Sequence, residues 1–208
     1  MNVIKRINEK RRVLRSKWGW EKHKLSDWYY TCVSTKTKEY DTSLDFTSLA
    51  EIFPVGLGEA PGILTLYGAS GPSASLVSGW AGYSNKYRQM IPINTLDTFL
   101  SGRYTDNAMA IKIDVEGAEF HVLKGAIDTL NRKRKPTWFL EICLDQFHPD
   151  SLNKNFLETF QLFFDSGYDA IIADKENTAV SIEDVRNRVK NRSTGHSEFN
   201  YVFAPSSK

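Results

Sequence analysis

Acidic residues stand at the ends of two apolar segments in the middle of this 208-residue chain. Residues 108–115 read as a β-strand, and alternation along it places Asp114 and Glu116 on one face together with Lys112. Residues 137–143 read as a second, almost wholly apolar strand, with Glu141 near its end. Carboxylates gathered at one edge of a sheet can bind a metal ion, orient a hydroxyl group or act as a general base. Because burying several together raises the pKa of at least one, such a cluster favours a functional role.

A structural interpretation of the same residues stays open. Glu119 opens the predicted helix that follows, where a carboxylate suits the positive end of the helix dipole. Lys112 can pair with Glu116 on an exposed face of the strand. His148 precedes a proline in a loop and is more typical of a turn than of a site. Spacing alone therefore leaves both interpretations of Asp114 and Glu116 open.

The elements that would position these acids alternate between strands and helices. The strands are expected at residues 108–115, 137–143, 168–173 and 199–203, and the helices at 119–132 and 155–166. This order predicts an open α/β sheet in which the first two strands are adjacent and parallel, and the last two form an antiparallel pair at one edge. In such sheets ligands bind beyond the carboxyl ends of the strands, which is where the acids lie.

The first half of the chain is less regular. Residues 1–25 are predicted to be helical and residues 28–34 to form a strand. Residues 52–57 and 63–67 are expected to pair as a hairpin about a turn that contains proline and glycine. Residues 68–87 form a long loop rich in glycine and serine, and a loop of that length is usually functional or mobile.

Composition restricts the class of protein. A hydrophobic content of 41% and a charged content of 25% are ordinary for a globular domain. No apolar run approaches the roughly 18 residues that a membrane span needs, and the basic N-terminus lacks the apolar core of a secretory signal. The two cysteines, Cys32 and Cys143, are too few for a disulfide scaffold. We expect both to be reduced thiols in a cytoplasmic protein.

The charge of +2 is unevenly distributed. Residues 1–24 hold nine lysines and arginines against Glu9 and Glu21, a local charge of +7 that leaves −5 for the remainder. Apolar residues at helical spacing in this segment predict a basic amphipathic helix. It can contact an anionic partner, such as phosphate or a membrane surface, or it can be a solvated helix that packs on the domain.

A longer motif surrounds the acids. Residues 112–119 read Lys-Ile-Asp-Val-Glu-Gly-Ala-Glu and residues 122–126 read Val-Leu-Lys-Gly-Ala. This run resembles the signature of the FkbM family of S-adenosylmethionine-dependent O-methyltransferases. Residues 52–59, 62–67 and 93–97 are similar to the segments that precede that signature, residues 73–76 to the family's serine-rich loop, and residues 136–141 to the strand that follows. The resemblance covers roughly residues 52–145.

The resemblance implies a Rossmann-like methyltransferase fold, with a mostly parallel sheet and an antiparallel edge pair. It also implies S-adenosylmethionine as cofactor and a hydroxyl group of a sugar or small metabolite as methyl acceptor. On this basis Asp114, Glu116 and Glu141 are the candidate catalytic residues. Asp114, Ser75 and Gly117 are the candidate cofactor-binding residues, and no metal site is expected.

The chain departs from the family in one respect. A glycine-rich cofactor loop belongs before residue 52, where Gly19 is the sole glycine. The N-terminal part can be truncated, the strand at 28–34 can replace the usual central strand, or a second chain can supply it. We therefore separate a basic N-terminal segment, 1–50, from a methyltransferase-like domain, 51–208. Two alternatives to an active methyltransferase stay open: a non-catalytic binding or assembly module, and a metal-dependent enzyme that uses the strand-end acids.

Overall fold

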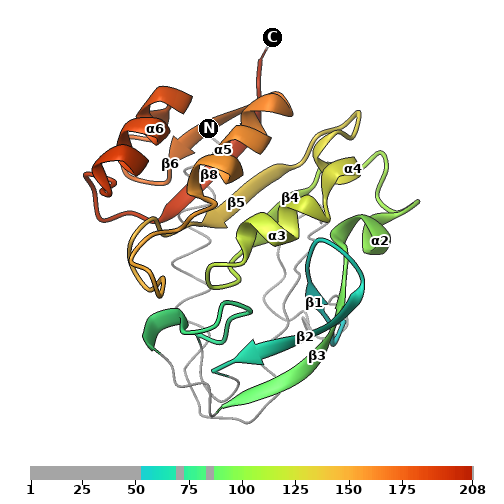
Figure 1. Cartoon of the computed structure of the whole chain (residues 1–208). Coiled ribbons are helices and arrows are strands. Elements are labelled where there is room, and N and C mark those ends of the chain that lie inside the picture. The colour runs from blue at the N-terminus through green and yellow to red at the C-terminus, as the bar shows by residue number, and fades with distance from the viewer. Residues whose placement is uncertain (1–52, 69–72, 83–86, 208) are drawn as a thin grey trace, which may run out of the picture.

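The structure, a computed structural model, describes residues 53–68, 73–82 and 87–207 (Figure 1). The predicted helix at 1–25, the predicted strand at 28–34 and the domain boundary at residue 50 lie outside these residues. The same holds for the basic segment and its anionic partner, so those expectations stay predictions.

A larger sheet, a smaller sheet and several helices make up the described part of the chain. The strands are β1 (Gly56–Leu57), β2 (Gly62–Tyr67), β3 (Arg88–Asn94), β4 (Ala110–Ile113), β5 (Thr137–Glu141), β6 (Tyr168–Ile172), β7 (Ala179–Val180) and β8 (Asn200–Pro205). The helices are the 3₁₀ turn η2 (Trp80–Gly82), α2 (Leu96–Leu100), α3 (Glu119–Lys124), α4 (Ile127–Leu130), α5 (Phe156–Asp165) and α6 (Ile182–Asn191).

The larger sheet has the strand order β4-β5-β8-β6-β7. β4 and β5 are adjacent and parallel, as the sequence predicted. The predicted antiparallel pairing of β6 with β8 is also confirmed. The predicted place of this pair at an edge is wrong, because β8 lies between β5 and β6, and the two-residue β7 is the outer strand on that side. The α/β class is therefore right, but the sheet is mixed rather than mostly parallel. Burial of three successive residues, Tyr201, Val202 and Phe203, explains the interior position of β8.

The smaller sheet corrects the predicted hairpin. Its order is β1-β3-β2, with β3 parallel to β1 and antiparallel to β2, so the two strands expected to pair with each other lie on either side of a third. The sequence did not reveal β3 because Pro92 interrupts it, and proline cannot donate a hydrogen bond to a sheet. Pro92 is tolerated here opposite Ile63, on an exposed face of this small sheet.

The helix predicted at residues 119–132 is two short helices, α3 and α4, separated at Gly125. A Cβ atom at Gly125 would collide with the backbone carbonyl of Gly58, in the turn that follows β1. The Gly125 carbonyl accepts a hydrogen bond of 3.0 Å from the Asp97 amide, and the Asp97 carboxylate accepts from the amides of Asp128 and Thr129 at the start of α4. Close backbone packing at Gly125 therefore joins the small sheet to the helices.

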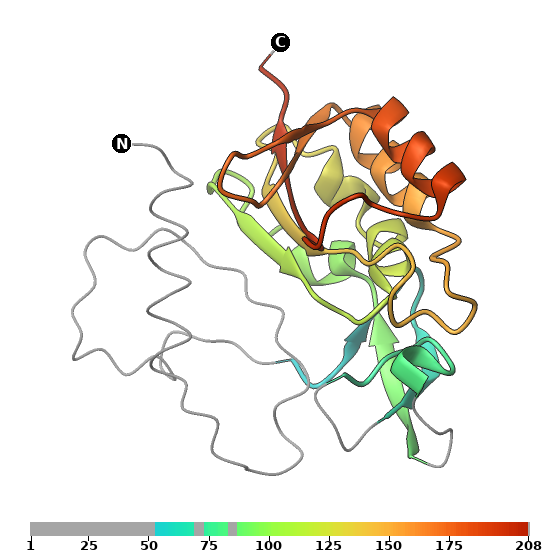
Figure 2. The same ribbon diagram turned by 90° about the vertical axis from the view of Figure 1, so that its left-hand side faces the viewer.

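Helices α3, α5 and α6 lie on one face of the larger sheet (Figures 1 and 2). Between that face and the helices is the main core, in which Trp138, Phe160, Phe163 and Phe203 are fully buried. The indole of Trp138 donates to the Tyr168 hydroxyl at 3.1 Å, and that hydroxyl donates to the Leu130 carbonyl at 3.1 Å, so these two buried polar groups are paired. The core thus fixes β4 and β5, whose carboxyl ends carry the acids. In the part of the chain described, no helix combines the length and apolar character that crossing a membrane requires.

Candidate functional site

A pocket opens at the carboxyl ends of β4 and β5. Its lining consists of four acids, two aromatic residues, a glycine and a cysteine: Asp114, Glu116, Glu119, Glu141, Trp80, Phe147, Gly117 and Cys143. The structure therefore brings together all three candidate catalytic residues and places Gly117 beside them. This is the edge at which ligands bind in open α/β sheets.

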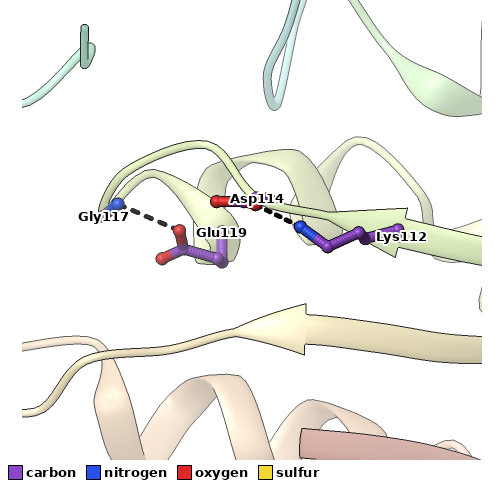
Figure 3. A network of polar contacts seen from close by, with 4 residues as sticks. All are labelled: Lys112, Asp114, Gly117 and Glu119. Atoms are coloured by element: carbon purple, nitrogen blue, oxygen red, sulfur yellow. Dashed lines mark hydrogen bonds and ion pairs between the residues drawn. The ribbon is translucent and has the colours of Figure 1, made fainter. Parts of the chain in front are cut away.

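Asp114 follows β4 directly and is partly exposed. It forms an ion pair with Lys112, from the same strand (Figure 3). The sequence suggested that Lys112 pairs with Glu116, and the structure gives Asp114 that partner instead. Both side chains of the pair keep more than a third of their surface in water, so the pair contributes little to stability.

Glu116 does not continue the alternation of β4, because the strand ends at Ile113. Its backbone is left-handed, with φ of 54°, and Gly117 follows with φ of 92°. A left-handed conformation strains any residue other than glycine by about 1–3 kcal/mol. The Ser75 hydroxyl donates to the Glu116 carbonyl at 2.5 Å, and the indole Nε1 of Trp80 donates to its Oε2 at 2.9 Å. Both contacts hold Glu116 in place from the loop at 73–82.

Burial raises the pKa of Glu116, which is half-buried, above that of a free glutamate. The hydrogen bond from Trp80 lowers the pKa, whereas the charges of Asp114 and Glu141 raise it. A raised pKa makes a carboxylate a stronger base. Glu116 therefore combines access to the pocket with increased basicity.

Trp80 forms one wall of the pocket and is itself only 3% exposed. Its six-membered ring lies against Gly117, so a side chain at residue 117 would collide with the indole. The ring packs edge-on against His148, with centroids 4.7 Å apart, and lies 5.9 Å from the Phe147 ring. Gly117 is thus required both for its left-handed backbone and for the room it leaves.

Glu119 is 3% exposed, although it lies in the first turn of α3. Its Oε1 accepts a hydrogen bond of 2.9 Å from the Gly117 amide (Figure 3). Burial raises the pKa of Glu119 to about 7, and the backbone hydrogen bonds only partly oppose this. The expected place at the helix start is correct, but Glu119 also belongs to the pocket, which the sequence did not indicate.

Cys143 and His148 lie close to the acids but are poor candidates for catalysis at neutral pH. Burial raises the pKa of the Cys143 thiol to about 12, so the nucleophilic thiolate is scarce. Burial lowers the pKa of His148 to about 4, and a hydrogen bond to the Cys143 backbone opposes this shift only weakly. The His148 imidazole is therefore neutral and serves as packing for Trp80.

Ser75 is 1% exposed and does not line the pocket. Its hydroxyl donates to Glu116 and accepts from the Val77 amide at 2.9 Å, so its described contacts are structural. Trp80 and Phe147 were missed as site residues by sequence reasoning. The available signal was a tryptophan inside the glycine- and serine-rich loop that was already a candidate for function.

The arrangement suits reactions that need a carboxylate base and a favourable site for positive charge. Four carboxyl groups in one pocket fit a cationic group such as a sulfonium better than an anion. Among the described residues, no three histidine, cysteine or acidic side chains are arranged to hold a metal ion.

Comparison with known families identifies one match. A family model described as the methyltransferase FkbM domain matches residues 30–170, which is more than half of the chain. The matched range contains Trp80 and every acid of the pocket. Searches of curated proteins and of solved structures found no significant match.

Proposed function

This chain belongs to the FkbM methyltransferase family, and we propose that it transfers a methyl group from S-adenosylmethionine to a hydroxyl group of a sugar or small metabolite. The observation that supports this proposal most directly is Glu116. A strained, half-buried carboxylate with a raised pKa lies in a pocket at the carboxyl edge of the sheet, where a base for a weakly acidic hydroxyl is needed.

The cofactor, when bound, would supply a methyl group carried on a positively charged sulfur. The acidic lining fits this charge, and Asp114 and Gly117 are the lining residues that we expect nearest to the donor. Ser75 supports this region indirectly, through the Glu116 carbonyl. The segment expected to hold the adenosine precedes residue 52 and lies outside the described residues.

Glu116 would take the proton that the acceptor hydroxyl loses when it is methylated. Asp114, whose side chain is 39% exposed, orients the acceptor or the donor. Glu141, at the end of β5, adds negative charge near Glu116, whose pKa is raised mainly by burial and further by the charges of Asp114 and Glu141. Trp80 and Phe147 form an apolar wall that limits access of water to the reacting atoms.

Two measurements test the proposal. The first is calorimetric titration with S-adenosylmethionine and with S-adenosylhomocysteine, which should detect binding. The second is the rate of methyl transfer to a panel of sugars and small hydroxylated metabolites, which should fall about 100- to 10,000-fold in Glu116→Gln without loss of donor binding. A chain that binds neither compound at millimolar concentration would instead be a binding or assembly module. The lack of a glycine-rich loop before residue 52 favours this second candidate. The cytoplasmic location is still a prediction from the sequence.

A further inference from the structure

The loop at residues 73–82 holds the turn after β4 by three contacts. The Ser75 hydroxyl binds the Glu116 carbonyl, the Trp80 indole N–H binds the Glu116 carboxylate, and the Trp80 ring covers Gly117. The loop is fixed in turn, since the Ala81 amide donates to the Phe147 carbonyl at 2.7 Å. The indole therefore has a defined position from which to direct the carboxylate.

The nature of the Trp80 contact matters for the chemistry. An indole N–H can only donate a hydrogen bond, so it favours the ionised carboxylate, which is the form that accepts a proton. The indole N–H of Trp80 donates to Oε2 of Glu116. The Trp80 side chain is only 3% exposed and packs against Gly117, Phe147 and His148, so its position is fixed. A glutamate held at one oxygen in this way presents its other oxygen in a restricted set of orientations.

We propose that Trp80 is the positioning residue for Glu116: its indole N–H holds one carboxylate oxygen so that the other is aimed at the acceptor hydroxyl. This inference rests on the proposed methyltransferase function and adds a residue to it. Trp80 touches neither reacting atom in this proposal. It acts through Glu116, and it does so by the N–H rather than by the bulk of the ring.

The contributions of the N–H and the ring can be separated with Trp80→Phe, which keeps an aromatic wall and removes the donor. The hydrogen bond lowers the Glu116 pKa, so its loss should raise that pKa further. The other charged groups around Glu116 are unchanged: Asp114 and Lys112 on the β4 side, Glu141 on β5 and Glu119 on α3. The acid limb of the pH–rate profile should move to higher pH, and kcat should fall about 10- to 100-fold while KM for the donor changes little.

Trp138→Phe is the matched control. It removes an indole hydrogen bond of 3.1 Å from a tryptophan that is buried in the core and does not line the pocket. It should lower thermal stability without moving the pH–rate profile. The double variant Trp80→Phe/Glu116→Gln gives a second comparison, because Trp80→Phe should have little further effect on kcat once the carboxylate is gone.

The titration of Glu116 is followed directly by ¹³C NMR of its carboxyl carbon, assigned from Glu116→Gln, in the full chain and in Trp80→Phe. A higher midpoint in Trp80→Phe, with the shifted rate profile, is the expected result. An active enzyme whose Glu116 titration and rate profile are the same in Trp80→Phe, with only a lower melting temperature, overturns the positioning role and leaves Trp80 as packing. If the wild-type chain transfers no methyl group to any acceptor, the proposed function fails, and the positioning role of Trp80 in that reaction fails with it.

Discussion

Replacing Glu119 by glutamine should change how the stability of this protein depends on pH. Glu119 is 3% exposed, and burial raises its pKa from 4.5 to about 7. The folded state therefore binds this proton more tightly than the unfolded state. Stability from this group is fully present below about pH 4.5 and is lost as pH rises through about 7. A shift of this size corresponds to about 3 kcal/mol of unfolding free energy at most, since each pKa unit is worth about 1.4 kcal/mol.

Glu119→Gln has almost the same shape and keeps an oxygen that can accept from the Gly117 amide. The unfolding free energy of Glu119→Gln should therefore increase relative to that of the wild type as pH rises from about 5 to 8. The difference between the two should approach the limit of about 3 kcal/mol. Urea denaturation at several pH values measures this difference. The comparison between variants is needed because His148 contributes the opposite slope: burial lowers its pKa to about 4, so its part of the stability increases between about pH 4 and 6.5.

Asp150→Asn is a suitable control. The hydrogen bond from Lys154 lowers the pKa of Asp150, so any stability that it contributes is lost only as pH falls below about 3.8. Its difference from the wild type should be flat between about pH 5 and 8. If the Glu119→Gln difference is equally flat, Glu119 is ionised throughout that range, and the Gly117 amide and the positive end of α3 outweigh its burial.

Two further substitutions test the active edge and the fold. Asp114→Asn should reduce turnover more than it reduces donor binding, which kinetics and calorimetry on the same variant would measure. If the variant keeps full activity but has a lower melting temperature, Asp114 is structural, and the catalytic group is then expected at Glu141 or in the loop at 68–87. Gly125→Ala should destabilise the protein by about 1–3 kcal/mol in a urea titration, because the new Cβ meets the Gly58 carbonyl. Gly62→Ala is the control and should have a much smaller effect, because no atom lies within 4 Å of its added Cβ.

Regular amphipathic patterns allowed the sequence to predict the elements nearest the site. The alternation of Ile111 and Ile113 with Lys112 predicted β4, and the apolar run around Trp138 predicted its parallel neighbour. What failed was the order of the remaining strands. The apolar sequence of β8 predicts a buried strand, but it does not predict which strands lie beside it. Strand pairing depends on contacts between residues that are far apart in sequence.

Helix α6 was missed for a different reason. Its core contact is concentrated in Val185, and the remaining positions are mostly charged, so a polar stretch was all that the composition suggested. The local signal was the capping box: Ser181 accepts from the Asp184 amide, and the Asp184 carboxylate accepts from the Ser181 amide and hydroxyl. Attention to caps as well as apolar periodicity would have identified this helix.

The candidate site was predicted in its acids but not in what surrounds them. Period-two alternation placed Glu116 on the same face as Asp114, whereas the strand ends first and Glu116 is aimed by a left-handed backbone. No local pattern predicts that conformation at a glutamate, because it is maintained by Ser75 and Trp80, which lie far away in sequence. Tertiary contacts therefore determine the part of the site that matters most for the proposed chemistry.

The surroundings of the acids also divide their roles. Asp114 is ion-paired with Lys112, and its side chain keeps 39% of its surface in water. Glu119 is buried with a pKa of about 7 and is fixed to the Gly117 amide, so it has little access to a substrate. Glu116 has both a raised pKa and a place in the pocket lining. Among these three, Glu116 is the group that can receive a proton from a substrate and release it to solvent, and for this reason the proposed mechanism depends on the contacts that position it.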